Sequence, residues 1–264
     1  MIKRNLLLAL ADIRDGIASI YIWPMLGWLE IKQRYRRSLL GPLWLTLSTG
    51  IMIGGMGPLY GRLLKQDVGG YFGYLAVSFV VWMFFSNLIN ESCNVFIAAE
   101  GYIKQIKLPL TIHVLRNIWK NFIIFAHNFI IVVVVLFFFP PATLVYLLLI
   151  PVALIIVAAN ALWLGILLGL ICARYRDVPL IVASLVQVLF FLTPVLWQAD
   201  MLERNKWVAD INPLFHFIEI IRAPILGHAP TEFTWMVVLG TTIVGIIFSL
   251  AMFSRFRCRI AYWV

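Results

Sequence analysis

Basic residues that could bind phosphate follow a short apolar segment near the N-terminus. Residues 17–29 are apolar but too short to cross a membrane, and they include Trp23 and Trp28. The residues that come next are Arg34, Tyr35, Arg36 and Arg37. Guanidinium groups bind phosphate oxygens bidentately, and aromatic residues beside cations are typical of a helix in the membrane interface. The pattern predicts an interfacial helix over residues 17–37. Contact with anionic lipid would explain the same charges equally well.

Catalytic and metal-binding patterns are missing from the sequence. It contains no Gly-x-x-x-x-Gly-Lys-Ser/Thr loop for ATP and no Gly-x-Ser-x-Gly elbow. Its four histidines have no metal-ligand spacing. Two ionisable residues lie near or inside apolar segments, where a charge is costly. We expect Lys120 to extend to the membrane surface and a neutral His127 to share a hydrogen bond with a neighbouring helix, beside Asn128.

Composition indicates a helical membrane protein. The hydrophobic set makes up 62% of the 264 residues and charged residues only 12%, against about 45–50% and about 25% in soluble domains. Five intervals of 22 to 53 residues carry no charge, and a spanning helix needs roughly 20 residues. The longest interval holds two spans separated by Pro140-Pro141. The six predicted spans are 39–60, 71–90, 117–139, 143–172, 178–196 and 234–254.

The distribution of Lys and Arg predicts the orientation. Sixteen of the 21 basic residues fall in the N-terminal segment, the loops after spans two and four, and the C-terminal tail. The positive-inside rule therefore places both termini in the cytoplasm. The net charge of +9 is explained by topology without nucleic acid. The three cysteines, Cys93, Cys172 and Cys258, fall near cytoplasmic span ends, so no disulfide is expected. Residues 1–37 form the interfacial segment and 38–264 one transmembrane domain.

Two loops have patterns of their own. Residues 98–108 predict a short amphipathic cytoplasmic helix, with an apolar face and a polar face. The apolar face has Tyr102, Ile103 and Ile106, and the polar residues are Glu100, Lys104 and Lys107. An ordinary connector is the alternative. Residues 198–228 include Asn212, Pro213 and Arg222 and are too apolar for a free loop but too short to span. They predict re-entrant helices in the outer leaflet, or else a helix lying flat on the outer surface.

Six motifs in order resemble the permease subunits of polysaccharide-exporting ABC transporters, and most closely those of O-antigen exporters. The motifs are Arg34-Tyr35-x-x-Ser38-x-Leu40-Gly41-Pro42-Leu43-Trp44, Ile106-Lys107-Leu108-Pro109-Leu110, Arg174-Tyr175-Arg176-Asp177-Val178, Thr193-Pro194-Val195, Asn212-Pro213-Leu214 followed by Arg222, and Arg259-Ile260-Ala261-Tyr262-Trp263-Val264. Each motif is weakly specific, but their order covers nearly the whole chain. Permeases of capsule and teichoic-acid exporters are similar and remain alternatives.

The resemblance implies a homodimer in the bacterial inner membrane, paired with two copies of a separate ATPase. This chain would bind no cofactor, and ATP with Mg would bind the partner. The substrate implied is a polysaccharide on undecaprenyl diphosphate. In that setting residues 98–108 would be a coupling helix docked on the ATPase, and residues 34–37 would meet the lipid diphosphate at a gate.

A glycan pore would suit aromatic side chains, which pack against the C–H faces of sugars without fixing one orientation. Aromatic residues lie inside the predicted spans and not only at their ends. They are Trp44, Phe79, Trp82, Phe85, Phe190 and Phe191. Contact with lipid or with other helices is the alternative. A stand-alone channel or secondary carrier, and an intramembrane enzyme, are further readings of the whole chain; the scarcity of ionisable residues in the spans disfavours both.

Overall fold

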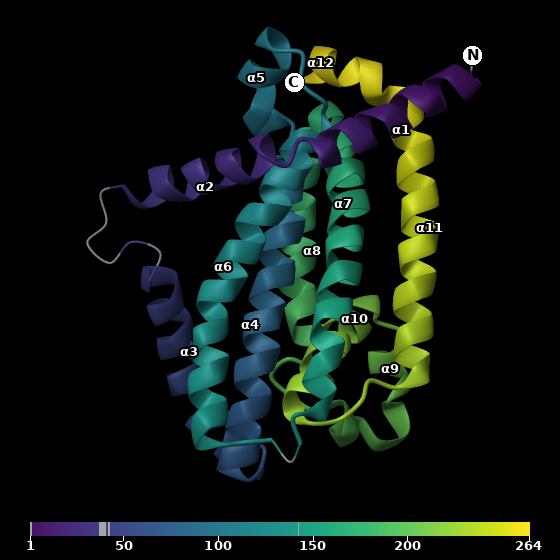
Figure 1. Ribbon diagram of the computed structural model, residues 1–264. Helices are drawn as coiled ribbons and strands as arrows, with labels where there is room; N and C mark the ends of the chain where they lie inside the picture. Colours follow the sequence, from purple (N-terminus) through teal and green to yellow (C-terminus); the bar gives the residue numbers. More distant parts are fainter. Residues whose placement is uncertain (1, 37–40, 42, 142) are drawn as a thin grey trace.

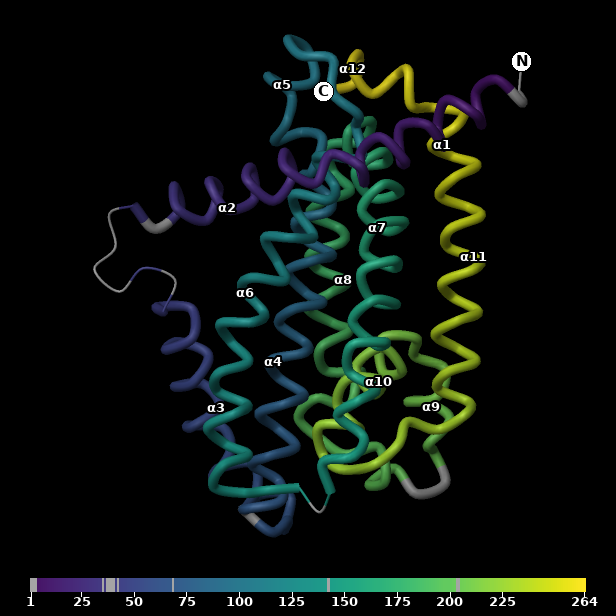
Figure 2. The backbone as a smooth tube through the Cα atoms, in the orientation of Figure 1, coloured from purple at the N-terminus to yellow at the C-terminus, as the bar shows by residue number. Residues whose placement is uncertain are grey.

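The computed structural model describes residues 2–36, 41, 43–141 and 143–264, and within them the chain is all helical. Long helices stand side by side, and both termini lie at the same end of the bundle (Figure 1). We call this the terminal end and the opposite one the far end. In the smooth trace of Figure 2 the first two helices cross the terminal end at a steep angle to the bundle.

Those two helices are α1 (Ile2–Ala18) and α2 (Ile22–Tyr35). The predicted interfacial helix at 17–37 is thus α2, whereas α1 was not predicted as a helix. The two are separated at Ser19, whose hydroxyl donates to the Asp15 carbonyl at 2.7 Å. Helix α1 contacts α6 and α11, and α2 contacts α6. The N-terminal segment is therefore packed on the bundle along its length.

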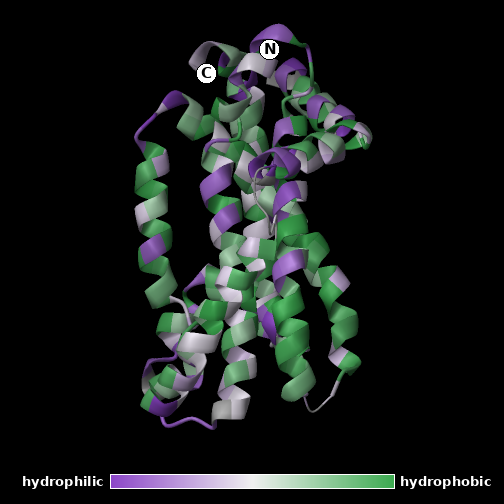
Figure 3. Cartoon of the chain, turned by 90° about the vertical axis from the view of Figure 1, so that its left-hand side faces the viewer, coloured by the Kyte–Doolittle hydropathy of each residue, from purple (hydrophilic) through white to green (hydrophobic). Residues whose placement is uncertain are grey.

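Four helical segments of the described residues are long and apolar enough to cross a membrane: Gly69–Cys93, Thr111–Phe138, Val145–Arg174 and Glu232–Trp263. They contain α4 (Val68–Cys93), α6 (Thr111–Phe138), η2 (Val145–Leu149) with α7 (Ile150–Arg174), and α11 (Glu232–Phe256) with η4 (Arg257–Arg259) and α12 (Ile260–Trp263). They overlap the predicted spans two, three, four and six. Hydrophobic residues dominate the bundle, and hydrophilic residues gather toward its two ends (Figure 3).

The other two predicted spans correspond to α3 (Leu43–Leu63) and α8 (Val178–Leu192). Helix α3 packs on α4 and α6, while α8 packs on α4 and α7. Helix α8 has 15 residues, so at 1.5 Å per residue it covers less than the roughly 30 Å of a bilayer core. Four helical segments of the described residues are thus candidate spans by length and composition, and the count of six stays a prediction.

Between α8 and α11 the chain forms η3 (Ala199–Asn205), α9 (Trp207–Asp210) and α10 (Pro213–Leu226). The start of α10 is fixed by Asn212, whose side-chain oxygen accepts from Leu214 N at 3.0 Å, with proline at the first helical position. It ends at Gly227, whose φ of 91° suits glycine. Helix α10 contacts α4, α7 and α11, so protein covers it, as the re-entrant interpretation requires. Its depth in a bilayer stays a prediction.

Small residues let the long helices approach closely. A Cβ on Gly245 of α11 would lie 2.2 Å from the Trp163 ring of α7, and one on Gly165 would lie 2.6 Å from Val114 of α6. Contacts this short are not possible for a side chain, so glycine is required where these helices cross. Without a hydrophobic effect between helices in lipid, such close packing supplies much of the association energy.

Candidate functional site

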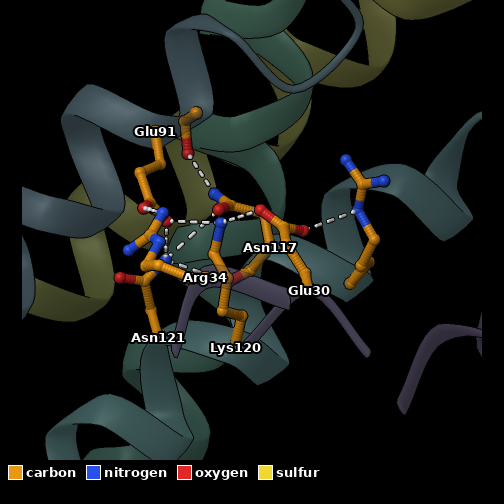
Figure 4. Close-up of polar contacts among 8 residues, drawn as sticks. Glu30, Arg34, Glu91, Asn117, Lys120 and Asn121 are labelled. Carbon is orange, nitrogen blue, oxygen red and sulfur yellow. Dashed lines mark hydrogen bonds and ion pairs between the residues drawn. The ribbon is translucent and has the colours of Figure 1, made fainter. Parts of the chain in front are cut away.

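Ionic side chains from three helices meet near the terminal end of the bundle. Lys120 of α6 donates to Glu30 of α2 at 2.6 Å and pairs with Glu91 of α4 at 3.0 Å (Figure 4). Lys120 is only 5% exposed. The prediction that it extends to the membrane surface is wrong, because two carboxylates neutralise it where it is buried. A buried charge needs such partners to offset the cost of its desolvation.

Further polar groups extend this cluster. Arg34 pairs with the second oxygen of Glu91 at 3.1 Å, and Arg116 lies 3.5 Å from Glu30. Asn121 donates to Glu91 at 2.7 Å, and Figure 4 shows Arg34, Glu91 and Asn121 around Lys120. Three cations thus surround two carboxylates. We call Glu30, Arg34, Glu91, Arg116 and Lys120 the charge cluster. It ties the crossing helix α2 to α4 and α6.

Of the four residues predicted to meet phosphate, the structure places one in this cluster. Arg34 lies there against Glu91, whereas Arg36 is exposed outside it. Arg37 and the side chain of Tyr35 lie outside the described part of the chain. The sequence analysis missed Glu30 and Glu91 as partners because they are 90 and 29 residues from Lys120. Their only signal is that each is a carboxylate bordering an apolar segment.

A second anchor at the terminal end is Asp12 of α1. Its carboxylate accepts hydrogen bonds from Leu110 N at 3.2 Å, Thr111 N at 3.0 Å and the Thr111 hydroxyl at 2.7 Å. It also accepts from Arg257 at 2.9 Å. A carboxylate at a helix N-terminus satisfies the first backbone N–H groups and suits the helix dipole. Asp12 therefore fastens α1 to the start of α6 and to the C-terminal segment.

The short helix predicted over residues 98–108 is observed as η1 (Ile97–Ala99) and α5 (Glu100–Gln105), while its role in coupling stays a prediction. It protrudes at the terminal end (Figure 1). Helix α5 ends three residues before the predicted limit at 108, because Ile106 adopts extended backbone. Tyr102 and Ile106 are 47% and 51% exposed, whereas Ile103 packs on the core of its own chain. The two exposed side chains remain available to a partner.

The polar side of α5 is held by an ion pair. Lys104 donates to Glu100 at 2.6 Å, and this hydrogen bond, with the charge of Lys104, lowers the pKa of Glu100. Lys107 lies beyond the helix in the segment that returns to α6. Beside α5 is an open groove of about 740 Å³, bounded by α1, residues 103–110 and the C-terminal segment. The terminal end thus offers two exposed apolar side chains next to a groove.

The aromatic residues proposed for a pore divide into two groups. Phe79, Trp82 and Phe85 are at most 7% exposed, and the Trp82 ring packs on Phe190 with centroids 5.6 Å apart. Trp44 and Phe191 are 54% and 64% exposed. The first group contributes to the core of the protomer, and the second faces outward from it. That any of them lines a pore stays a prediction.

At the far end, the predicted residues of the re-entrant segment hold α10 in place. Arg222 is 3% exposed and donates to the Tyr74 hydroxyl at 2.8 Å, to Ser78 at 3.0 Å and to the Pro194 carbonyl at 2.6 Å; it also pairs with Glu219. Asn212 donates to Thr193 at 2.8 Å. Asn212 and Arg222 thus connect α10 to the ends of α4 and α8.

His127 and Asn128 differ from what the sequence predicts. His127 Nδ1 lies 2.8 Å from the Ile123 carbonyl of its own helix. Asn128 makes the contact between helices, accepting from Thr46 of α3 at 3.4 Å. The Asn128 amide therefore provides a polar link between α3 and α6, and the His127 ring forms its hydrogen bond within its own helix.

The structure is that of a polytopic helical membrane protein, with two helices crossing one end of the bundle and α5 protruding there (Figure 1). Residues 23–226 match the family model described as ABC-2 type transporter, which covers most of the chain. The chain belongs to the ABC-2 type transporter family. This family supplies the membrane subunit and not the ATPase.

Curated relatives are similar over nearly their whole length. An O-antigen export system permease protein RfbA from Klebsiella pneumoniae is 23% identical over 238 residues, covering 88% of this chain and 90% of the relative. A protein of the same name from Myxococcus xanthus is 21% identical over 233 residues, covering 87% and 89%. The resemblance to permeases of polysaccharide exporters is therefore confirmed.

Proposed function

We propose that this chain forms the membrane channel of an ATP-driven exporter that moves undecaprenyl-diphosphate-linked polysaccharide, of the O-antigen class, out of the cytoplasm. The observation that carries the proposal is the collinear match to O-antigen export permeases over about nine tenths of their length. A match over so much of both proteins favours the same kind of cargo.

The working exporter we infer is a homodimer with two copies of a separate ATPase in the inner membrane, with six spans per subunit and cytoplasmic termini. ATP and Mg would bind the ATPase. The partner would dock at the terminal end, where Tyr102 and Ile106 are exposed beside the groove of about 740 Å³. Capsule and teichoic-acid exporters would use the same architecture with another cargo.

The charge cluster fits a gate for the lipid diphosphate. Arg34, Arg116 and Lys120 are already gathered at the junction of α2 with the bundle, and their partners are carboxylates. Phosphate oxygens form the same charge-assisted hydrogen bonds as carboxylate oxygens. A diphosphate arriving along α2 could therefore replace Glu91 at Arg34 and weaken the link between α2 and α4, leaving Lys120 as the bridge between Glu30 and Glu91. Trp44 and Phe191, exposed on the protomer, are the aromatic residues we infer to meet the glycan.

The test uses a bacterial strain that lacks the gene for this chain. A plasmid in that strain supplies this chain together with its partner ATPase. If the chain exports polysaccharide, the strain should display it on the cell surface. An ATPase variant unable to hydrolyse ATP should leave lipid-linked glycan inside the cell. Proteoliposomes with the purified pair should translocate glycan only when ATP is added. Transport by this chain alone without ATP would instead identify a stand-alone channel or carrier and overturn the proposal.

A further inference from the structure

The far end contains an open cavity of about 630 Å³, and Arg222 is the one predicted site residue in its wall. Its wall is formed by the first turns of α4, the end of α6 with Pro140 and Pro141, the start of η3, and α10. Its volume falls within the ~300–1,000 Å³ typical of small-ligand sites. Figure 1 shows α10 beside α4 and α7 in this part of the bundle.

The wall is open where α4 carries glycines. A Cβ on Gly73 would meet nothing within 4 Å, and one on Gly70 would meet only the Asp67 carboxylate at 3.7 Å. The cavity is therefore bordered by bare backbone, and a ligand can approach α4 closely. The buried network of Arg222 with Tyr74 and Pro194 keeps α10 at its distance from α4, which holds the cavity open without help from a partner.

The chemistry of the lining selects the ligand. Asp67, Asp200 and Glu219 line the cavity together with Phe139, Phe215 and His228. Arg222 lies in the wall but is paired with Glu219, and Asp200 is paired with Lys206. An anion would meet carboxylates here, and a diphosphate is therefore disfavoured. Within the described residues, no group of three or more His, Cys, Asp or Glu side chains is placed to hold a metal ion.

Carboxylate oxygens that accept hydrogen bonds from hydroxyl groups, beside aromatic faces that pack on C–H surfaces, suit a neutral sugar. We propose that this cavity binds a neutral saccharide segment of the exported glycan at the far end of the channel. The inference rests on the proposed function and goes beyond it, because it separates a sugar site at one end of the bundle from a phosphate-responsive gate at the other.

The experiment uses the full-length chain with its ATPase in nanodiscs, and as probe the neutral oligosaccharides released by mild acid from the host's own surface glycan. We expect saturable binding by isothermal calorimetry. Gly73→Leu, which places a side chain in the cavity, should raise Kd at least tenfold. Its control is Gly240→Leu on α11, where a Cβ also meets nothing within 4 Å, and Kd there should stay within twofold.

A second variant tests the same cavity in case Gly73→Leu does not fold. Asp67 accepts from Gly70 N at 2.9 Å, and asparagine preserves this helix cap while removing the charge. Asp67→Asn should raise Kd by about tenfold, the size expected for one hydrogen bond to a charged group. Excess inorganic pyrophosphate should not displace the sugar. Displacement by pyrophosphate, or unchanged Kd in both variants, would overturn the inference.

The deletion strain used to test the proposed function, together with these nanodiscs, distinguishes failure of this inference from failure of the proposed function. If the wild-type chain restores surface polysaccharide but its nanodiscs bind no oligosaccharide, the saccharide site is refuted and the export function stands. If the wild-type chain restores no polysaccharide, the proposed function itself fails.

Discussion

At the scale of single residues, burial decides which ion pairs matter. Two Lys–Glu pairs have the same 2.6 Å separation but different surroundings. Lys120 with Glu30 has a lysine side chain 6% exposed, whereas Lys104 with Glu100 has both side chains about half exposed. Exposed pairs contribute about 0–1 kcal/mol, while removing one member of a buried pair costs about 3–5 kcal/mol. The two pairs therefore make a matched comparison.

Lys120→Met should destabilise the protein by about 3 kcal/mol, at the lower end of that range because Glu30 remains 34% exposed. The variant leaves Glu30 and Glu91 facing each other without their shared cation. Lys104→Met, as the control, should cost less than about 1 kcal/mol. Thermal unfolding in detergent measures both. Equal losses would show that the charge cluster is not buried in the folded protein.

At the scale of elements, α5 and the residue after it present the exposed apolar side chains of Tyr102 and Ile106, whereas Glu100 and Lys104 of α5 pair with each other. Tyr102→Ala with Ile106→Ala should weaken binding of the ATPase at least tenfold and uncouple ATP hydrolysis from export, because buried apolar anchors carry most interface energy. Lys107→Ala should stay within about threefold, as rim charges contribute little. Co-purification and ATPase assays measure this. Normal export by the double variant would leave α5 as an ordinary connector.

Helix packing gives a second test at this scale. Gly245→Ala places a Cβ 2.2 Å from the Trp163 ring, whereas Gly240→Ala on the same helix meets nothing within 4 Å. The first should separate α11 from α7 and lower the thermal midpoint. The second should be neutral or slightly stabilising, since alanine favours a helix by up to about 1 kcal/mol over glycine. Similar midpoints for both would contradict the observed crossing of α7 and α11.

Sequence patterns predict the elements whose composition is set by contact with lipid. The four long helices follow from charge-free intervals, because each must be apolar over about 20 residues. Helix α1 was not predicted because Asp12, Arg14 and Asp15 interrupt its apolar pattern. The ion pairs of the charge cluster could not be predicted because they join residues 29 to 90 positions apart in the sequence. Such pairing depends on how the helices pack. The roles of Arg222 in the wall of a cavity and of Asp12 at α6 could not be predicted for the same reason.

For the whole molecule, the two ends of the bundle differ in the groups that they present. The terminal end gathers the charge cluster, Asp12, α5 and both termini, and it offers exposed side chains to a partner. The far end has the covered helix α10 and the polar cavity beside it. If the positive-inside rule assigns the terminal end to the cytoplasm, energy coupling and lipid phosphate meet on one side and sugar on the other. The orientation of the chain therefore decides which compartment the charge cluster and α5 face.

One thiol tests that orientation. Cys93 and Cys172 are buried, whereas Cys258 is exposed at the terminal end. An impermeant maleimide should label the wild-type chain in inside-out vesicles but not in intact cells. Cys258→Ser should abolish the labelling, since the remaining two thiols react only after denaturation. Because Cys258 is exposed, absence of labelling from one side reports the membrane barrier and not burial of the thiol. Labelling of Cys258 in intact cells would reverse the orientation, place the charge cluster outside the cell, and remove the ATPase from reach of α5.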